Sequence, residues 1–404
     1  MAACLQEPSR PEPRRRGSPL VEAELRRWIR AQGRITFAEF MEVALYLPGG
    51  GYYATTSRIG RRGDFLTSPE THPIFGALLA RLAALMWRGL GSPVPFQIVE
   101  YGAGSGALCR QILEAAPRLD GDFASALRYL IVEVSSSLRA AQQAELSDLA
   151  NRVRWADAAD ANESTVGCVV ANELVDALPV HRLKITGAGP REVYVGLAAD
   201  RYLELLGTPS RPELPVYLSD QGVRPPGGSV VEINLAAREW LRKAVGRLHR
   251  GYVLVVDYGG AASDLYRRAG PRGNLRCFHR HGWTDDPYDR PGLQDISAPV
   301  DFSDLAGTGE RIGLQLVHEF SQANLLSGLG LGEALRWLQT SSLPVEERER
   351  NRAAMLALAD PKGLGGYRVL IQRKAAPAVE LTGPALLSMS PPPLLPSRPM
   401  AWPQ

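Results

Sequence analysis

Val99-Glu100-Tyr101-Gly102-Ala103-Gly104-Ser105-Gly106 is the stretch that decides the fold of this chain. The apolar run at residues 96–101 predicts a buried strand, and residues 106–115 have the pattern of a helix. The closely spaced glycines between them let the backbone approach a ligand, and the helix N-terminus offers unpaired N–H groups. A strand that runs straight into such a turn indicates a ligand-binding unit more than an ordinary tight turn.

Strand and helix patterns alternate along the chain around this turn. Further strands are expected at residues 129–134, 152–155, 167–171, 251–257 and 367–373. Further helices are expected at residues 73–89, 135–149 and 234–248. Strands separated by helices predict an α/β fold with a mostly parallel sheet and helices on both faces. Between residues 182 and 230 alternating segments such as 192–197 interrupt this rhythm, and we interpret them as a strand-rich insertion.

Composition divides the chain into four parts. Residues 1–19 are polar and Pro-rich, so we expect a disordered arm. Residues 20–92 form an N-terminal helical region, and the core follows over residues 93–375. Residues 376–404 contain eight prolines and are expected to be a disordered tail.

The bulk properties exclude several classes of protein. A chain of 404 residues that is 45% hydrophobic and 22% charged is too apolar to be disordered. Its net charge of +3 indicates no large nucleic-acid surface, and no run approaches the ~18–20 apolar residues of a membrane span. The four cysteines form no CxxC pair, which favours a reducing compartment. Without the apolar core of a secretory signal, a cytoplasmic location is the default expectation.

Glu100 helps to distinguish a dinucleotide site from an S-adenosylmethionine site, which the glycines alone do not. Gly102, Gly104 and Ala107 also satisfy the G-x-G-x-x-G/A fingerprint of dinucleotide-binding turns. A pyrophosphate site has little use for a carboxylate two residues before the first glycine. S-adenosylmethionine (SAM) has a sulfonium and an ammonium group, with which that carboxylate could pair directly or through water. The pattern therefore favours a class I methyltransferase over an NAD-dependent dehydrogenase.

Two further acids complete the predicted cofactor site. Glu133 closes the second predicted strand and fits the acid that accepts both ribose hydroxyls. It follows Gly106 by 27 residues, a longer gap than the ~20 of dinucleotide folds, which we assign to a long helix and loop. Asp157 lies just beyond the third strand, where it either reaches the adenine amino group or is a surface aspartate. The predicted cofactor-binding residues are Glu100, Gly102, Gly104, Gly106, Glu133 and Asp157.

Five motifs occur in one consistent order between residues 20 and 372. They are GDFLTSPE at 63–70, VEVS at 132–135, ANELVDALPVH at 171–181, DYG at 257–259 and PGLQDISAPVDF at 291–302. In this combination the chain resembles the MidA-like methyltransferases, class I SAM-dependent enzymes whose mitochondrial members assist assembly of respiratory complex I. Tyr101 and Ala103 depart from the Leu and Pro that are common in that family.

The resemblance implies a Rossmann-like class I methyltransferase core with an N-terminal helical extension and an insertion. It also implies symmetric dimethylation of an arginine in the 49-kDa-type subunit of complex I, the NuoD homologue in bacteria. The implied partner is a protein substrate, with no nucleic acid and no membrane span. The oligomeric state stays open, with a homodimer possible, and a mitochondrial matrix location applies only to a eukaryotic chain.

An arginine substrate calls for carboxylates, because a guanidinium stays protonated in ordinary surroundings and pairs with them in a bidentate fork. Glu173 and Asp176 follow the fourth predicted strand, at the carboxyl edge of the sheet where ligands bind. They are the candidates for gripping the target, and Asn172 reaches either SAM or the substrate. The alternative is that Glu173 and Asp176 only cap the following turn.

The GDFLTSPE loop places Asp64, Thr67 and Ser68 before a helix. One interpretation is that Ser68 caps that helix. The other is a lid over the methionyl end of SAM, which the length of the motif favours. His181 is a base or, more in keeping with its position, a structural histidine. His279 and His281 have a spacing that suits no common closed metal site, so no metal is predicted.

Two alternative functions stay open beside the enzyme. A non-catalytic assembly chaperone would retain the fold and bind SAM. An NAD-dependent oxidoreductase is the second alternative, and Glu100 argues against it. The residues Gln294, Asp295 and Asp301 either line the wall opposite the cofactor or brace loops.

Overall fold

The computed structural model describes residues 17–54, 67–157, 165–199, 201–280 and 282–380. Residue 64 and most of the expected arm and tail lie outside these ranges. The helical part begins with α1, whose first residue is Pro19 and whose preceding Ser18 N–H bonds to the carbonyl of Pro291 at 2.9 Å.

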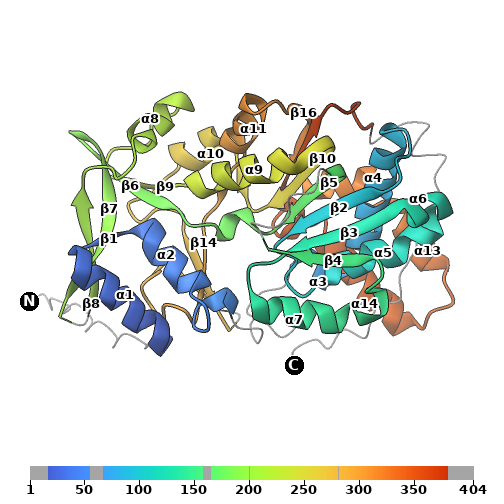
Figure 1. Cartoon of the computed structure of the whole chain (residues 1–404), viewed down its shortest axis with the longest axis horizontal. Coiled ribbons are helices and arrows are strands. Elements are labelled where there is room, and N and C mark those ends of the chain that lie inside the picture. Colours follow the sequence, from blue (N-terminus) through green and yellow to red (C-terminus); the bar gives the residue numbers. More distant parts are fainter. Residues whose placement is uncertain (1–16, 55–66, 158–164, 200, 281, 381–404) are drawn as a thin grey trace, which may run out of the picture.

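A seven-stranded sheet forms the core, in the order β16-β17-β10-β5-β2-β3-β4 (Figure 1). Its strands are β16 (Gln315–Ser321), β17 (Arg368–Lys374), β10 (Leu248–Asp257), β5 (Thr165–Asn172), β2 (Phe96–Tyr101), β3 (Leu127–Val132) and β4 (Val153–Ala156). The five strands from β10 to β4 are parallel, and β17 pairs antiparallel with both of its neighbours. The expected α/β fold with a mostly parallel sheet is confirmed.

Both faces of this sheet are buried, as parallel sheets require. Alternate residues divide between the faces, so Ile98 packs with α4 and α5 while Val99 packs with α9 and α11. Figure 1 shows α9 and α11 on one side of the sheet and α5 and α7 on the other. The helices around the sheet are α4 (Ile74–Gly89), α5 (Ala107–Leu119), α6 (Gly121–Ala126), α7 (Ser136–Glu145), α9 (Leu235–Arg247), α10 (Ala262–Arg267) and α11 (Phe302–Arg311).

A second sheet contains the expected insertion and one strand from the N-terminal part. Its strands are β1 (Ile35–Thr36), β6 (His181–Thr186), β7 (Gly189–Ala198), β8 (Arg201–Gly207) and β9 (Val230–Ile233), and α8 (Glu213–Asp220) follows β8. The helices α1 (Pro19–Gln32) and α2 (Phe37–Tyr46) lie beside this sheet, at the left of Figure 1. A capping box between Thr36 and Glu39 begins α2, with the N–H of Glu39 bonded to the Thr36 hydroxyl at 3.1 Å.

Short strands and helices complete the described chain. They are η1 (Tyr52–Ala54), α3 (Ser68–Thr71), η3 (Ser147–Leu149), η4 (Val175–Ala177), β11 (Gly259–Gly260), β12 (Arg276–His279), β13 (Gly282–Thr284), β14 (Asp295–Ser297), β15 (Val300–Asp301) and η5 (Leu364–Gly366). Three helices, α12 (Gln322–Gly328), α13 (Leu331–Thr340) and α14 (Val345–Ala357), connect β16 to β17. Among the described helices, none is both long and apolar enough to cross a bilayer.

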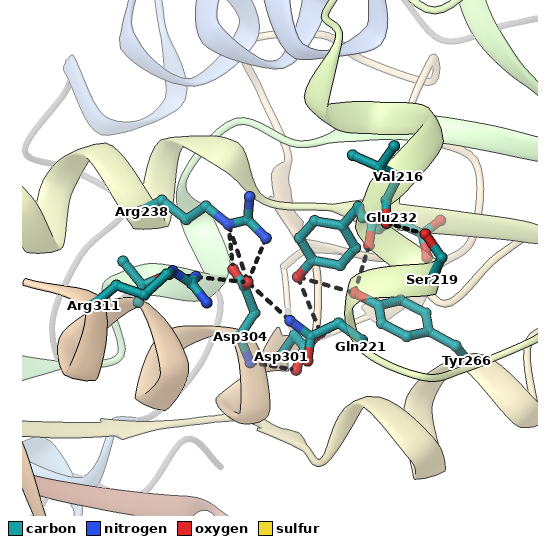
Figure 2. A network of polar contacts seen from close by, with 11 residues as sticks. Val216, Ser219, Gln221, Glu232, Arg238, Tyr266, Asp301, Asp304 and Arg311 are labelled. Carbon is teal, nitrogen blue, oxygen red and sulfur yellow. Dashed lines mark hydrogen bonds and ion pairs between the residues drawn. The ribbon is translucent and has the colours of Figure 1, made fainter.

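A buried polar network attaches the insertion to the core (Figure 2). Asp304 on α11 accepts hydrogen bonds from the Arg238 Nε on α9 at 2.8 Å and from the Gln221 side chain after α8 at 3.0 Å. Asp301 caps α11 by accepting the N–H of Asp304 at 3.0 Å, and it also accepts the Tyr217 hydroxyl at 3.0 Å. Of the two roles open for Asp301, bracing is therefore the one that the structure supports.

Candidate active site

A cavity of about 770 Å³ lies at the carboxyl ends of β2, β3 and β5. The glycine turn, the residues after β3 and those after β5 form its floor, while α2, η1 and α9 contribute side walls. This volume is within the ~300–1,000 Å³ typical of small-molecule sites.

The glycine turn requires glycine at each of its three predicted positions. Gly102, Gly104 and Gly106 have φ values of 67°, 54° and 84°, in the left-handed region that side chains disfavour. A Cβ on Gly102 would also lie 2.7 Å from the Leu174 side chain. Gly102 and Gly104 line the cavity, whereas Gly106 is the N-cap of α5 and lies against Leu146.

Glu100 lines the cavity from the end of β2, but the residue is only 3% exposed. The Tyr129 hydroxyl donates to its Oε2 at 2.7 Å. Burial raises the pKa of Glu100 to about 7. The structure thus places this carboxylate beneath the glycine turn, and its pairing with the positive end of SAM stays a prediction.

Glu133 also lines the cavity, directly after β3. The N–H of Ser135 donates to its Oε1 at 2.9 Å, and the Gln142 amide donates to its Oε2 at 3.0 Å. The same amide donates to the carbonyl of Gly104 at 2.9 Å. Gln142 therefore joins the predicted ribose acid to the glycine turn, a role that sequence reasoning missed because a glutamine within a helix carries no distinctive signal.

Asp157 is a predicted cofactor residue that is not brought to this cavity. Asp157 is exposed, forms an ion pair with Arg139, and is absent from the cavity lining. Of its two interpretations, the structure favours the surface aspartate. Asp64 lies outside the described residues.

Asn172 and Glu173 lie side by side on the cavity wall at the end of β5. The Asn172 amide donates to the Glu173 Oε1 at 3.1 Å, and the N–H of Ser68 donates to the same oxygen at 2.8 Å. Burial raises the pKa of Glu173 to about 7. The Asn172 Oδ1 is buried and has no hydrogen-bond partner among the described residues, so it is an acceptor in need of a donor.

Asp176 does not join this pair at the cavity. Asp176 lies in η4 and is absent from the cavity lining. Its pKa is raised by burial and by the negative charges of the nearby Asp257, Asp295 and Glu173. The Oδ2 of Asp257 accepts the N–H groups of Leu174, Val175 and Asp176 at 3.2, 2.8 and 3.3 Å. The turn is thus supported by Asp257, and the expected fork of Glu173 with Asp176 is not observed on the wall.

The described part of the GDFLTSPE loop closes one side of the cavity. Thr67 lines it and precedes α3, and Ser68 is fully buried. The Ser68 hydroxyl donates to Gln322 at 3.0 Å rather than accepting a helix N–H. The interpretation of Ser68 as the cap of the long helix was wrong, since α4 begins at Ile74.

The remaining candidates have structural roles. His181 shares a hydrogen bond of 2.7 Å with Glu192 in the second sheet, away from the cavity lining. Asp295 accepts hydrogen bonds from the hydroxyls of Tyr53 and Ser297, each at 2.8 Å. Asp295 thereby braces the loop beside the cavity.

Residues 78–319 match a family described as "Putative S-adenosyl-L-methionine-dependent methyltransferase". The chain belongs to this family. The glycine turn and the carboxylate of Glu133 on the cavity lining fit such a cofactor, so the residues present agree with SAM as the cofactor of this protein. The expected MidA-like methyltransferase identity is confirmed, and the NAD-dependent alternative has no support.

Named relatives cover most of the chain. Protein arginine methyltransferase NDUFAF7 of Mus musculus, mitochondrial, is 30% identical over 85% of this chain and 79% of its own. The Drosophila melanogaster homologue is 29% identical over 86% and 83%. A structure from Burkholderia thailandensis, described as a "likely methyl transferase" bound to S-adenosyl-homocysteine, is 30% identical, covers 91% of this chain and 94% of its own, and has a TM-score of 0.79.

Proposed function

We propose that this protein transfers a methyl group from SAM to a guanidinium nitrogen of an arginine in a protein substrate. The observation that carries the proposal is the pair of Asn172 and Glu173 on the wall of the cofactor cavity. The names of the relatives, which are protein arginine methyltransferases, support the same substrate class. From the resemblance to the MidA-like family, we propose a 49-kDa-type subunit of complex I as the substrate protein.

The charge of the cavity suits cationic ligands. Its described lining contains a single lysine, Lys243, and the six glutamates Glu42, Glu70, Glu100, Glu133, Glu173 and Glu239. Such an excess of acids attracts both a sulfonium and a guanidinium, since a cleft of one sign raises the local concentration of opposite charge.

When bound, SAM supplies a methyl group on a positive sulfur, which an in-line nucleophile can take. The protein must orient the guanidinium and remove a proton from it. In our proposal the Asn172 Oδ1 accepts an N–H of the target and fixes its orientation. The Oε2 of Glu173 takes the proton, because a carboxyl with a pKa of about 7 can do so near neutral pH.

The N-terminal helical part provides the proposed entrance for the arginine side chain. The rings of Tyr46 and Tyr53 stack with centroids 5.6 Å apart, and both residues line the cavity. Their hydroxyls donate to the carbonyl of Ala177 at 2.9 Å and to Asp295 at 2.8 Å, which fixes both rings. Glu42 contributes a carboxylate at the same end of the lining. Aromatic faces and a carboxylate are the surfaces on which a guanidinium stacks and pairs.

The test is transfer from SAM labelled on its methyl group to a purified 49-kDa-type subunit, with mass spectrometry to locate the label. We expect dimethylated arginine with the native protein and at least about 100-fold slower labelling with Glu173→Gln. Label on another residue type would reject arginine as the target. Binding of S-adenosyl-homocysteine without any transfer would favour the assembly chaperone instead.

A further inference from the structure

The C-terminal helices α12 and α14 form hydrogen bonds to both ends of the short helix α3 through buried polar side chains. Gln322, the first residue of α12, bonds to Ser68 at the start of α3. Asn351 on α14 bonds to His72, the residue after α3, at 2.9 Å. These helices lie outside residues 78–319, which the family model matches, and they contact the candidate site through α3.

The orientation of the Gln322 side chain is determined by its partners. Its Nε2 donates to the carbonyl of Leu358 at 2.9 Å, and its Oε1 therefore faces Ser68, whose hydroxyl donates to it at 3.0 Å. Gln322 and Ser68 are both 0% exposed, so water cannot substitute for either bond. The backbone N–H of Gln322 donates to the carbonyl of Tyr367 at 2.7 Å, which anchors the residue itself.

His72 fixes the other end of α3 as a neutral ring. Its Nδ1 accepts the N–H of Ile74 at 3.0 Å, so its Nε2 carries the proton and donates to the Asn351 Oδ1. Burial lowers the pKa of His72 to about 4, and the ring stays neutral at physiological pH. The Asn351 amide in turn donates to the carbonyl of Glu347 at 2.8 Å. Both ends of α3 are therefore attached to fixed points on the C-terminal helices.

From α3 the contact continues directly to the candidate catalytic carboxylate. The N–H of Ser68 donates to the Glu173 Oε1 at 2.8 Å. This bond favours the charged carboxylate and opposes the rise in the pKa of Glu173 that burial causes. The location of Ser68 thus affects both the direction of the Glu173 side chain and its affinity for a proton.

We propose that Gln322 is a positioning residue for methyl transfer, through which the helices α12–α14 place Ser68 and hence the carboxylate of Glu173. The inference rests on the proposed function, because the importance of Glu173 comes from there. Gln322 touches neither the cavity nor the reacting atoms, since it is absent from the cavity lining.

The test compares Gln322→Met with Gln372→Met in the full-length protein. Methionine keeps the volume of glutamine and removes its hydrogen bonds, which limits repacking. Gln372 on β17 is a matched control, because it is also 0% exposed and also donates to a backbone carbonyl, that of Ala306 at 2.9 Å. That carbonyl belongs to α11, so the hydrogen bond of the control residue leads away from α3.

The first measurement is an NMR titration of glutamate carboxyl carbons, with the Glu173 signal assigned by its loss in Glu173→Gln. We expect the titration of Glu173 to move to higher pH in Gln322→Met and to stay in place in Gln372→Met. An unchanged titration in a folded Gln322→Met, or an equal shift in Gln372→Met, would overturn the inference. If Gln322→Met does not fold, Gln322→Leu, which also removes both side-chain hydrogen bonds of Gln322, is subjected to the same titration with the same expectation.

The second measurement is the pH–rate profile of methyl transfer. We expect kcat near pH 7 to fall roughly three- to tenfold in Gln322→Met, because the hydrogen bond that holds Ser68 is lost. The KM for SAM should be unchanged. The acid limb should move to higher pH. If the Glu173 titration shifts in Gln322→Met but the native protein transfers no methyl group, the proposed function is rejected and the positioning of Glu173 by Gln322 is retained. If the native protein transfers the methyl group and Gln322→Met has the same titration and rate, the proposed function is retained and the positioning is rejected.

Discussion

Glu173 adopts a left-handed backbone conformation with φ of 53°, buries its carboxyl group and accepts two N–H donors on one oxygen. A residue other than glycine in this region carries a strain of about 1–3 kcal/mol. The N–H of Glu173 donates to the carbonyl of Val256 at 2.8 Å, and Asp257 holds the turn that follows. The surrounding contacts therefore maintain an unfavourable conformation that directs this side chain to the cavity wall.

Replacing Glu173 by Gln tests its chemical role at constant shape. We expect methyl transfer to fall by about 10²–10⁴-fold, the usual contribution of a general base. The affinity for S-adenosyl-homocysteine, measured by calorimetry, should stay within about twofold. Transfer at the native rate would remove Glu173 from the proposed mechanism.

The pH dependence follows from the direction of the pKa shift. Because the pKa of Glu173 is about 7 in the folded protein, kcat should rise with pH through about 7 as the carboxylate forms. The folded pKa lies above the ordinary glutamate value of 4.5, so the folded state binds the proton more tightly. The free energy of unfolding should therefore fall between pH 4.5 and about 7, and less steeply in Glu173→Gln. Urea unfolding of both proteins across this window measures the difference.

Glu133 and Asp157 provide a paired test of the cofactor assignment. Glu133→Ala should weaken SAM binding by about 1–3 kcal/mol through lost charge-assisted hydrogen bonds. Asp157→Ala should leave the affinity within about twofold, because this side chain is exposed and pairs with Arg139. Calorimetric titration of both variants decides the matter, and an unchanged affinity in Glu133→Ala would reject the ribose assignment.

At the scale of elements, the β2–α5 turn depends on close packing as well as on backbone freedom. Gly102→Ala should weaken SAM binding measurably, because the added Cβ would lie 2.7 Å from the Leu174 Cδ1 and displace that side chain, which lines the cavity. Gly91→Ala is the control, since Gly91 has φ of 82° but no atom within 4 Å of an added Cβ. Both variants should lose about 1–2 kcal/mol of stability from the left-handed conformation alone. Unchanged SAM binding in Gly102→Ala would show that the turn is not the cofactor cradle.

The sequence predicted most core elements but not all of their ends. The strand expected at 129–134 is β3 (Leu127–Val132), because Val134 has left the sheet and is 69% exposed. The helix expected at 106–115 continues as α5 to Leu119, since its buried face continues past residue 115. Apolar periodicity marks the centre of an element well, whereas its end depends on neighbours that periodicity does not contain.

At the scale of the whole molecule, the network of Figure 2 joins the insertion to the core. Arg238→Met should lower the free energy of unfolding by about 1–3 kcal/mol, because the buried Asp304 carboxylate loses its charged hydrogen bonds to Arg238. Asp304 keeps its hydrogen bond to Gln221 and its ion pair with Arg311. Arg352→Met is the control, since its ion pair with Glu349 is exposed and should contribute less than about 1 kcal/mol. Chemical unfolding measures the stability of both variants. An equal loss of stability in the two would contradict our interpretation that this network attaches the insertion to the core.

The amino-acid sequence by itself determined the α/β class, the glycine turn with its acids and the family. These features depend on local patterns: a strand, a turn that only glycine can form, and carboxylates at strand ends. The tertiary structure decided which acids share the cavity. Asp157 and Asp176, which follow predicted strands in sequence, are absent from its lining, while Gln142 on α7 and Gln322 on α12 connect to the site. Buried hydrogen bonds between segments up to 279 residues apart, such as that between His72 and Asn351, carry no periodic signal in the chain, so only folding reveals them.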